Sequence, residues 1–232
     1  RFLGSGFWSP ESALVVRIAS HVDGEHLDAG WLARRIDAAA ALRHTLGFPS
    51  ATDTGYRLIN AEGDALPGLI VDVYGDTATV LFGTIGMWRL AQDVYAHVAR
   101  VTGAKRVVAL AAVRPAQEGF TQALEGVRGE GTEALRFLER GLAMEVPTSV
   151  TQKTGYYFDQ REQRARVEAL SKGRDVLDAF SFIGSPRSSL KPRICLTELM
   201  IAARISSTDS VLLPSYVMSK SHRRSARLLP GL

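Results

Sequence analysis

The chain has 232 residues, of which 46% are hydrophobic and 22% are charged, as is ordinary for a soluble globular protein of one large or two small domains. No apolar run approaches the roughly 20 residues that a transmembrane helix needs, and no signal-peptide pattern is visible. The single cysteine, Cys195, excludes an internal disulfide, so we expect a cytoplasmic protein with no membrane partner.

The formal net charge of +4 is unevenly distributed along the chain. Residues 185–232 contain eight Lys or Arg and two acidic residues, whereas residues 1–184 are slightly acidic. Basic charge indicates nucleic-acid binding only where it lies on a folded face, so the net charge gives little support for an RNA-binding protein.

The first half of the chain predicts a hairpin and a helix. Residues 1–10 are typical of a hairpin end and residues 13–18 of the following strand, but one hairpin buries no core, so residues 1–20 should pack poorly. A helix should begin at Asp28 or Gly30 and run to Arg43. We expect its arginines to form a solvated face rather than an RNA contact; they are Arg34, Arg35 and Arg43.

A compact α/β layer should follow, with a helix on one face of the sheet. The expected strands are residues 56–60, 69–74, 77–82 and 106–113, and the helix is residues 88–101. Residues 119–132 should be a loop, and a hairpin should turn at Arg140 and Gly141. Asp64 and Asp72 are expected to cap turns rather than to carry chemistry.

The stretch 151–184 predicts a ligand site. It reads TQKTGYYFDQREQRARVEALSKGRDVLDAFSFIG, which is typical of a loop, an amphipathic helix ended by Gly173, a buried strand over 176–180 and a second loop. Ligands of open α/β sheets bind outside the carboxyl ends of the strands, so residues 178–184 should meet a small molecule. Asp159 and Arg161 either cap and pair on the helix or face that ligand.

Two motifs carry a family resemblance. The first motif is KTGYYFDQREQR followed by VLDAFSFIG, and the second is RLINAEGDALPGLIVDVYG. In these motifs the chain resembles class I S-adenosylmethionine-dependent methyltransferases that modify cytosine C5 of large-subunit ribosomal RNA. The resemblance implies an α/β chain with three parts: the end of a PUA domain (1–20), a central α/β domain with an N-terminal helix (21–147) and the start of a Rossmann-like methyltransferase domain (148–184). Residues 185–232 are an atypical basic tail outside the resemblance. The implied partner is large-subunit rRNA, and the implied cofactor is S-adenosylmethionine. The implied cofactor-binding residues are Lys153, Tyr156, Asp178, Phe180, Ser181 and Gly184.

The chain departs from the family pattern after Gly184. The family's second glycine, its ribose-binding acid and its target-base segment have no match downstream. Methylation at C5 needs a thiolate that adds to C6, and Cys195 has no base or family context, so we assign no catalytic residue and expect little or no activity. The five histidines show no metal-ligand spacing, so no metal site is expected.

Alternatives to this interpretation concern the tail and the function. Residues 185–232 contain ten serines and one glycine, which suggests truncation or a shifted reading frame near Gly184; the competing interpretation is a basic RNA-binding tail. The alternative function is a non-catalytic RNA-binding or interaction protein. A dinucleotide-dependent oxidoreductase is disfavoured because no G-x-G-x-x-G follows a strand.

Overall fold

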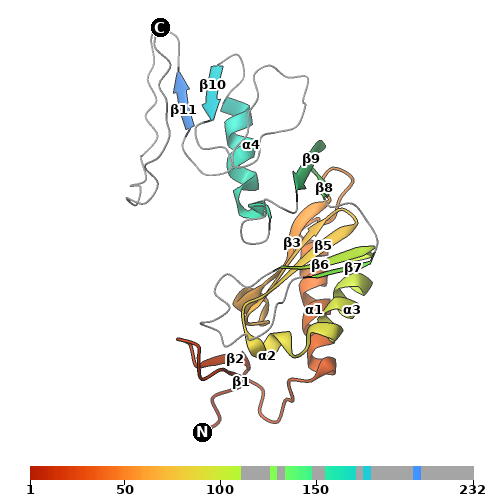
Figure 1. The fold of residues 1–232 in the computed structure, drawn as a ribbon. Helices are drawn as coiled ribbons and strands as arrows, with labels where there is room; N and C mark the ends of the chain where they lie inside the picture. Colours follow the sequence, from red (N-terminus) through yellow and green to blue (C-terminus); the bar gives the residue numbers. More distant parts are fainter. Residues whose placement is uncertain (111–125, 130–133, 148–154, 171–174, 179–200, 205–232) are drawn as a thin grey trace.

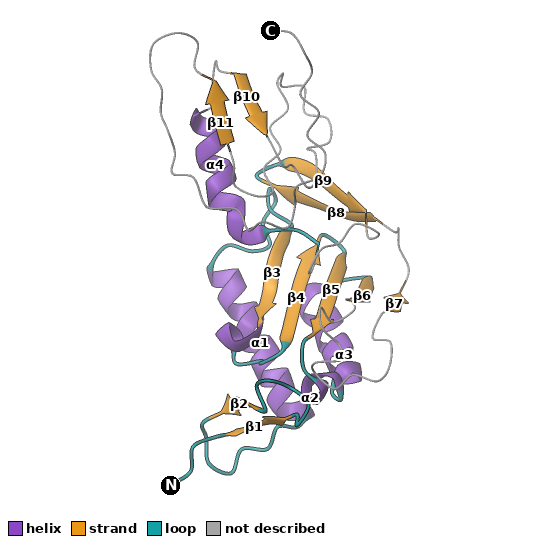
Figure 2. Cartoon of the chain, turned by 60° about the vertical axis from the view of Figure 1, so that its left-hand side comes forward, coloured by secondary structure: helices purple, strands orange, loops and turns teal. Residues whose placement is uncertain are grey.

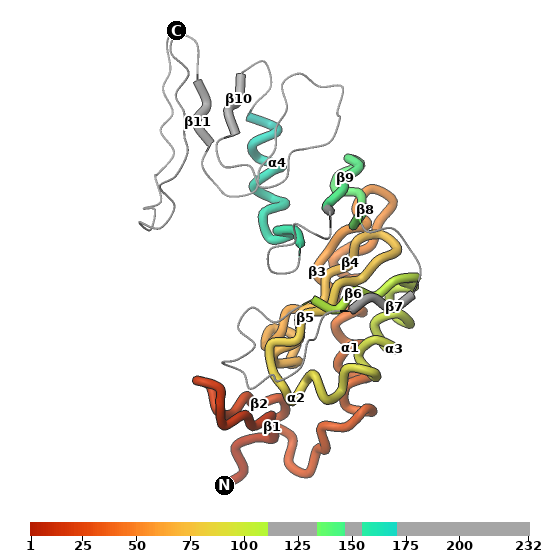
Figure 3. The backbone as a smooth tube through the Cα atoms, in the orientation of Figure 1, coloured from red at the N-terminus to blue at the C-terminus, as the bar shows by residue number. Residues whose placement is uncertain are grey.

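The computed structural model describes residues 1–110, 126–129, 134–147, 155–170, 175–178 and 201–204. A central sheet lies between an N-terminal hairpin and a C-terminal part that contains helix α4 (Figure 3). Among the described residues, none of the helices combines the length and the apolar character that crossing a membrane requires.

The N-terminal hairpin joins β1 (Ser5–Trp8) and β2 (Val16–Ser20) in antiparallel pairing. Its inner face packs on the rest of the protein, since the Phe7 ring lies edge-on against Trp31 with centroids 6.1 Å apart. Its outer face is exposed, including Trp8 at 66% and Val16 at 59%. The expectation of poor packing therefore holds for the outer face only, and the PUA assignment of residues 1–20 stays a prediction.

Helix α1 (Ala29–Thr45) begins where the sequence predicts. The Asp28 side chain accepts a hydrogen bond from the Trp31 backbone N–H at 2.8 Å, which satisfies one of the free donors at a helix start. This contact lowers the pKa of the Asp28 carboxyl. The side of the helix that faces the sheet buries Trp31, Leu32, Ile36 and Ala39.

The central sheet has five strands in the order β3-β4-β5-β6-β7, in which only β5 and β6 are parallel (Figure 2). Their bounds are Gly55–Asn60 (β3), Leu69–Tyr74 (β4), Thr77–Phe82 (β5), Arg106–Leu110 (β6) and Gly126–Gly129 (β7). The predicted hairpin of β4 and β5 is confirmed. The predicted loop over 119–132 is wrong at β7, which pairs with β6 and adds a strand at the sheet edge.

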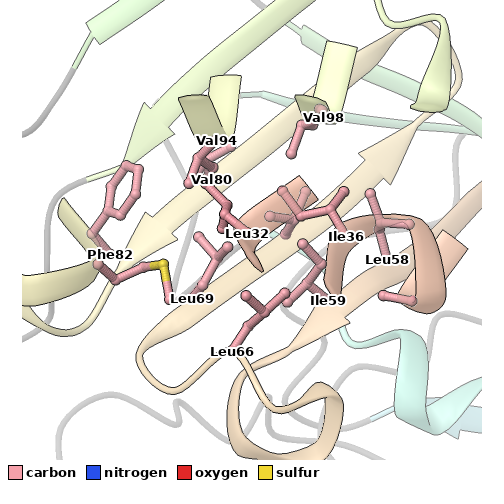
Figure 4. Close-up of a cluster of buried hydrophobic side chains, with 14 of the residues drawn as sticks. Leu32, Ile36, Leu58, Ile59, Leu66, Leu69, Val80, Phe82, Val94 and Val98 are labelled. Atoms are coloured by element: carbon pink, nitrogen blue, oxygen red, sulfur yellow. The ribbon is translucent and has the colours of Figure 1, made fainter. Parts of the chain in front are cut away.

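Two helices follow β5, where the sequence predicts one. Helix α2 (Ile85–Trp88) begins at Thr84, whose side chain accepts a hydrogen bond from the Met87 N–H, and α3 (Ala91–Thr102) ends at Gly103 with φ of 67°. Helices α1 and α3 lie side by side on one face of the sheet (Figure 1). The hydrophobic core lies between these helices and the strands (Figure 4).

The arginines of α1 correct one expectation. The Arg43 side chain is 12% exposed, and its two terminal nitrogens donate to Asp64 at 2.7 and 2.6 Å. Its Nε also donates to the Arg57 carbonyl at 2.9 Å, so Arg43 joins the helix end to β3 and to the short 3-10 helix Ala61–Asp64. The solvated-face interpretation is wrong for Arg43, because its side chain is nearly buried and paired with Asp64; the pair was not predicted because the two residues are 21 positions apart along the chain.

The remaining described elements are β8 (Ala134–Glu139), β9 (Leu142–Pro147), the 3-10 helix η4 (Phe158–Gln160), α4 (Arg161–Leu170), β10 (Asp175–Asp178) and β11 (Ile201–Arg204). The β8–β9 hairpin turns at Arg140 and Gly141, as predicted. Strand β10 pairs antiparallel with β11, whereas a Rossmann-like start implies parallel neighbours. Only these two strands of that part of the chain are described, so the domain assignment over 148–184 stays a prediction.

Candidate functional site

The described part of the family-like segment 153–164, called the signature segment below, contacts the β8–β9 hairpin at a joint formed by Glu139, the last residue of β8. The Glu139 side chain is 8% exposed. Arg164 from α4 donates to it through Nε at 2.6 Å and through Nη2 at 2.7 Å, one bond to each carboxylate oxygen. Bidentate pairing of this kind fixes both distance and orientation. Tyr156 adds a longer hydrogen bond at 3.4 Å from its hydroxyl to Glu139.

A second arginine, Arg161, joins the same segment to β3. Its guanidinium donates to the Gly55 carbonyl and lies over the Phe48 ring, 4.4 Å from the centroid. Its Nε is 3.6 Å from a carboxylate oxygen of Asp53 and 3.6 Å from one of Glu139. Cation–π contact and charge pairing in a nearly buried position both favour this geometry. Arg161 therefore contacts the central domain through Gly55, Phe48, Asp53 and Glu139, and it also lies 5.8 Å from the centroid of the Phe158 ring within its own segment.

An aromatic cluster fills the space beneath these charges. It consists of Tyr74, Phe137, Tyr156 and Phe158, with ring centroids 5.0–5.5 Å apart in mostly edge-to-face pairs. Gly55 makes room for it, because a Cβ at that position would lie 2.8 Å from Phe137 Cγ and 2.9 Å from Phe158 Cε1. Edge-to-face aromatic pairs contribute about 0.5–1.5 kcal/mol each beyond area burial.

Burial raises the pKa of the Tyr74 hydroxyl well above its ordinary value, and the nearby Asp72 carboxylate adds to the shift. Asp72 is fully buried in the middle of β4, where it accepts from Arg57 Nε at 2.9 Å and from Arg57 Nη2 at 3.0 Å. Burial acts to lower the pKa of Arg57, but the hydrogen bonds that Arg57 donates to Asp72 and the charge of that carboxylate outweigh it, and the pKa is raised. The expectation that Asp72 caps a turn is wrong, since it forms a buried ion pair within the sheet.

The structure describes two of the six predicted cofactor-binding residues. Tyr156 lies in the aromatic cluster with 4% exposure, next to Gly155, whose φ of 121° is a conformation that favours glycine. Asp178 is the last residue of β10, whereas the predicted strand spans 176–180, of which residues 179 and 180 lie outside the described residues. The other four lie outside the described residues, so their convergence stays a prediction; they are Lys153, Phe180, Ser181 and Gly184.

Sequence reasoning missed Glu139 and Arg164 as partners. Glu139 appears in the sequence only as the end of a predicted strand, and Arg164 only as the polar side of a predicted helix. Their separation of 25 residues is beyond any periodic pattern. One signal was available, because buried strand ends that carry an acid need a cationic partner. Within the described ranges, no group of three or more potential metal ligands occurs.

Known proteins resemble this chain in sequence and in fold. No protein-family model matches it. A ribosomal RNA large subunit methyltransferase from Deinococcus radiodurans is 38% identical over 192 residues, which are 79% of this chain and 47% of the relative. A ribosomal RNA large subunit methyltransferase I from Shewanella denitrificans is 33% identical over 187 residues, 80% of this chain and 47% of the relative. The chain thus spans about half the length of the curated relatives it matches.

Two solved structures share the fold. A protein assigned as a methyltransferase and complexed with SAH aligns with a TM-score of 0.58 at 19% identity, over 71% of this chain and 41% of its own. A protein assigned as a SAM-dependent methyltransferase from Streptococcus mutans aligns with a TM-score of 0.59 at 19% identity, over 73% of this chain and 43% of its own. The mixed α/β arrangement is therefore one that such proteins adopt.

Proposed function

We propose that this chain carries the scaffold and the cofactor-facing segments of an S-adenosylmethionine-dependent methyltransferase that acts on large-subunit ribosomal RNA. The observation that carries the proposal is the similarity to two large-subunit rRNA methyltransferases over about four fifths of the chain. The joint supports it, because the segment whose sequence resembles the family is built into the fold through Tyr156, Arg161 and Arg164.

Among the described residues, Asp178 is one that the proposal places at the cofactor. It is the last residue of β10, which is described only in an antiparallel pair with β11, so its assignment rests on the family resemblance. S-adenosylmethionine supplies an activated methyl group when it is bound. The role proposed for the chain's own residues is to bind and orient it, with Asp178 at the strand end and Tyr156 fixing the segment that follows Lys153.

Cytosine C5 is the proposed target atom. This atom becomes nucleophilic only after a thiolate adds to C6, and the chain has one thiol, Cys195. Cys195 lies outside the described residues, and its sequence context offers no neighbouring base. We therefore assign no nucleophile within this chain, and we propose that the chain contributes cofactor and RNA binding rather than the covalent step.

Isothermal titration with S-adenosylmethionine tests the proposal. We expect a dissociation constant near micromolar, which corresponds to about −8 kcal/mol. Asp178→Ala should weaken binding at least about tenfold, since each tenfold loss corresponds to 1.4 kcal/mol. Asp23→Ala, which removes an exposed acid in the loop after β2, is the matched control and should bind as the wild type does. The absence of heat at millimolar cofactor, from protein shown to be folded, overturns the proposal.

RNA methylation assays with radiolabelled cofactor and large-subunit rRNA complete the test. We expect RNA binding without formation of 5-methylcytosine by this chain alone. Formation of 5-methylcytosine that Cys195→Ala abolishes would assign the nucleophile to Cys195 and overturn our view of that residue. RNA binding by a chain that never binds the cofactor would support the non-catalytic alternative instead.

A further inference from the structure

The N-terminal hairpin of β1 and β2 concentrates the exposed apolar side chains of the molecule. Among the described residues, twelve large apolar side chains are exposed, and eight of them lie within residues 2–22. These eight are Phe2, Leu3, Trp8, Leu14, Val15, Val16, Ile18 and Val22. Monomeric soluble proteins rarely expose contiguous apolar patches of more than a few hundred Å², and larger patches mark interaction sites.

Strand pairing places three of these side chains on the outer face of the hairpin. Trp8 pairs directly with Val16, and Ile18 lies two residues further along β2. Residues directly opposite each other, and residues two apart on one strand, project from the same side of a sheet. Their side chains are 66%, 59% and 46% exposed, so this face meets solvent rather than the rest of the protein.

The inner face of the hairpin holds the charged residue that a surface strand ordinarily turns to water. Phe7 and Arg17 form the pair between the outward positions, and the Phe7 ring lies against Trp31. The Arg17 side chain is 19% exposed and lies 3.7 Å from a carboxylate oxygen of Glu62. Antiparallel strands with one solvated face ordinarily turn apolar residues inward and polar residues outward. The hairpin reverses this pattern, as a sheet does when its outer face is covered.

We propose that a second copy of this chain covers the outer face, in a dimer with two-fold symmetry. A two-fold interface uses the same patch on both partners, so Trp8, Val16 and Ile18 would supply both sides of it. The charged residue of these two strands points inward, so two copies can meet without like-charge repulsion. RNA would need cations along its phosphate backbone, which this face does not offer. Tryptophan is also among the residues that contribute most at interface centres.

The exposed area is sufficient for such a dimer. At these exposed fractions, each side chain presents on the order of 100 Å² of apolar surface. The eight side chains therefore present up to roughly 800 Å², which is about the area that each partner contributes to an interface of standard size. The hairpin lies at the opposite end of the central sheet from α4 (Figure 1), so docking there does not involve the joint. The inference is independent of the proposed function, since a chain that binds no cofactor can still dimerise.

Sedimentation velocity of the full chain between about 1 and 100 µM tests the proposal. We expect a reversible dimer whose dissociation constant rises at least about tenfold when Trp8→Ser and Val16→Thr are combined. The matched control is Leu46→Ser, which removes a leucine that is 62% exposed at the end of α1 and should change the constant by less than about twofold. Tryptophan emission of the wild type should shift to shorter wavelength as concentration rises, because dimerisation would bury the Trp8 ring.

The other outcomes each contradict the proposal. A wild type that stays monomeric at about 100 µM overturns it, and leaves the face to another apolar partner such as further strands of the predicted PUA domain. Aggregates of no fixed size also overturn it, because a two-fold interface closes at the dimer. A dimer that the double variant retains unchanged would place the interface elsewhere. If the double variant does not fold, Ile18→Thr replaces it under the same tenfold criterion, because threonine keeps the β-branched shape that strands favour.

Discussion

Two regions of the molecule are held together by different means. The helix-covered face of the central sheet is apolar, with Leu32, Ile36, Leu58, Val80 and Val94 among its nearly fully buried side chains. The joint at Glu139 combines four aromatic rings with three buried charges. The first region gains its stability from area removed from water, which tolerates variation in detail. The second depends on specific partners, because removing one member of a buried charged set leaves the others uncompensated.

The largest expected effect is in the helix-covered region. Phe82→Ala should lower the free energy of unfolding by about 3–5 kcal/mol, because its ring is fully buried and truncation leaves a cavity. Chemical denaturation measures this change. Leu42→Ala is the control on the exposed side of α1, where the leucine is 47% exposed, and should change stability by less than about 0.5 kcal/mol. Similar losses in both variants would contradict the assignment of the core.

Much of the helix-covered region could be predicted from the sequence. The bounds of β4 and β5 follow from their β-branched residues and the Gly75-Asp76 turn, and Asp28 marks the start of α1. These signals are local, since each lies within a few residues of the element that it defines. The expected helix over 88–101 corresponds to α3, and the short helix α2 before it was missed, although Thr84 is a residue type that favours a helix start.

The joint could not be predicted in the same way. Arg161 contacts Gly55 across 106 residues, and the Leu138 backbone N–H donates to the Thr54 hydroxyl across 84. Periodicity reports which side of an element is buried, but it does not report which distant element it meets. The resemblance of residues 153–161 to a family marked the segment as important, while the reason visible in the structure is its contact with the central domain.

The ion pair of Arg43 and Asp64 tests whether buried charges also stabilise the helix-covered region. Arg43→Ala should lower stability by about 3 kcal/mol, because Asp64, with its side chain 5% exposed, loses its bidentate partner. Arg100→Ala removes an ion pair with Asp37 in which both side chains are about half exposed, and should cost less than about 1 kcal/mol. Thermal and denaturant unfolding of both variants measure the difference. Equal costs would mean that burial does not decide the strength of these pairs.

A steric change at Gly55 perturbs the joint without altering any charge. Gly55→Ala should cost about 1–3 kcal/mol, because the new methyl group overlaps the Phe137 and Phe158 rings. Hydrogen exchange should rise over residues 155–170 more than over α1 or α3. In the control Gly63→Ala, the nearest atom is the flexible Asn60 amide nitrogen at 3.3 Å, so the change should be small. Uniform loss of protection along the chain would show that the joint and the core unfold as one unit.

The smallest effect at neutral pH belongs to Tyr74, and it grows in alkaline solution. Burial raises the pKa of its hydroxyl well above 10, with Asp72 adding to the shift and Arg57 opposing it. Because the folded-state pKa exceeds the unfolded one, the folded state retains a proton that the unfolded state loses above about pH 10. The stabilising contribution of the neutral hydroxyl is therefore complete at neutral pH and declines as the pH rises through 10.

Melting temperatures of the wild type and Tyr74→Phe between pH 7 and 11 measure this contribution. The variant should be slightly less stable at pH 7, because the Tyr156 backbone N–H loses the Tyr74 oxygen that accepts its hydrogen bond. Above pH 10 the wild type should lose stability more steeply than the variant, since phenylalanine has no proton to release. Parallel curves throughout the range would show that the hydroxyl ionises as freely in the folded joint as in the unfolded chain, and would contradict the tight burial that separates this region from the surface.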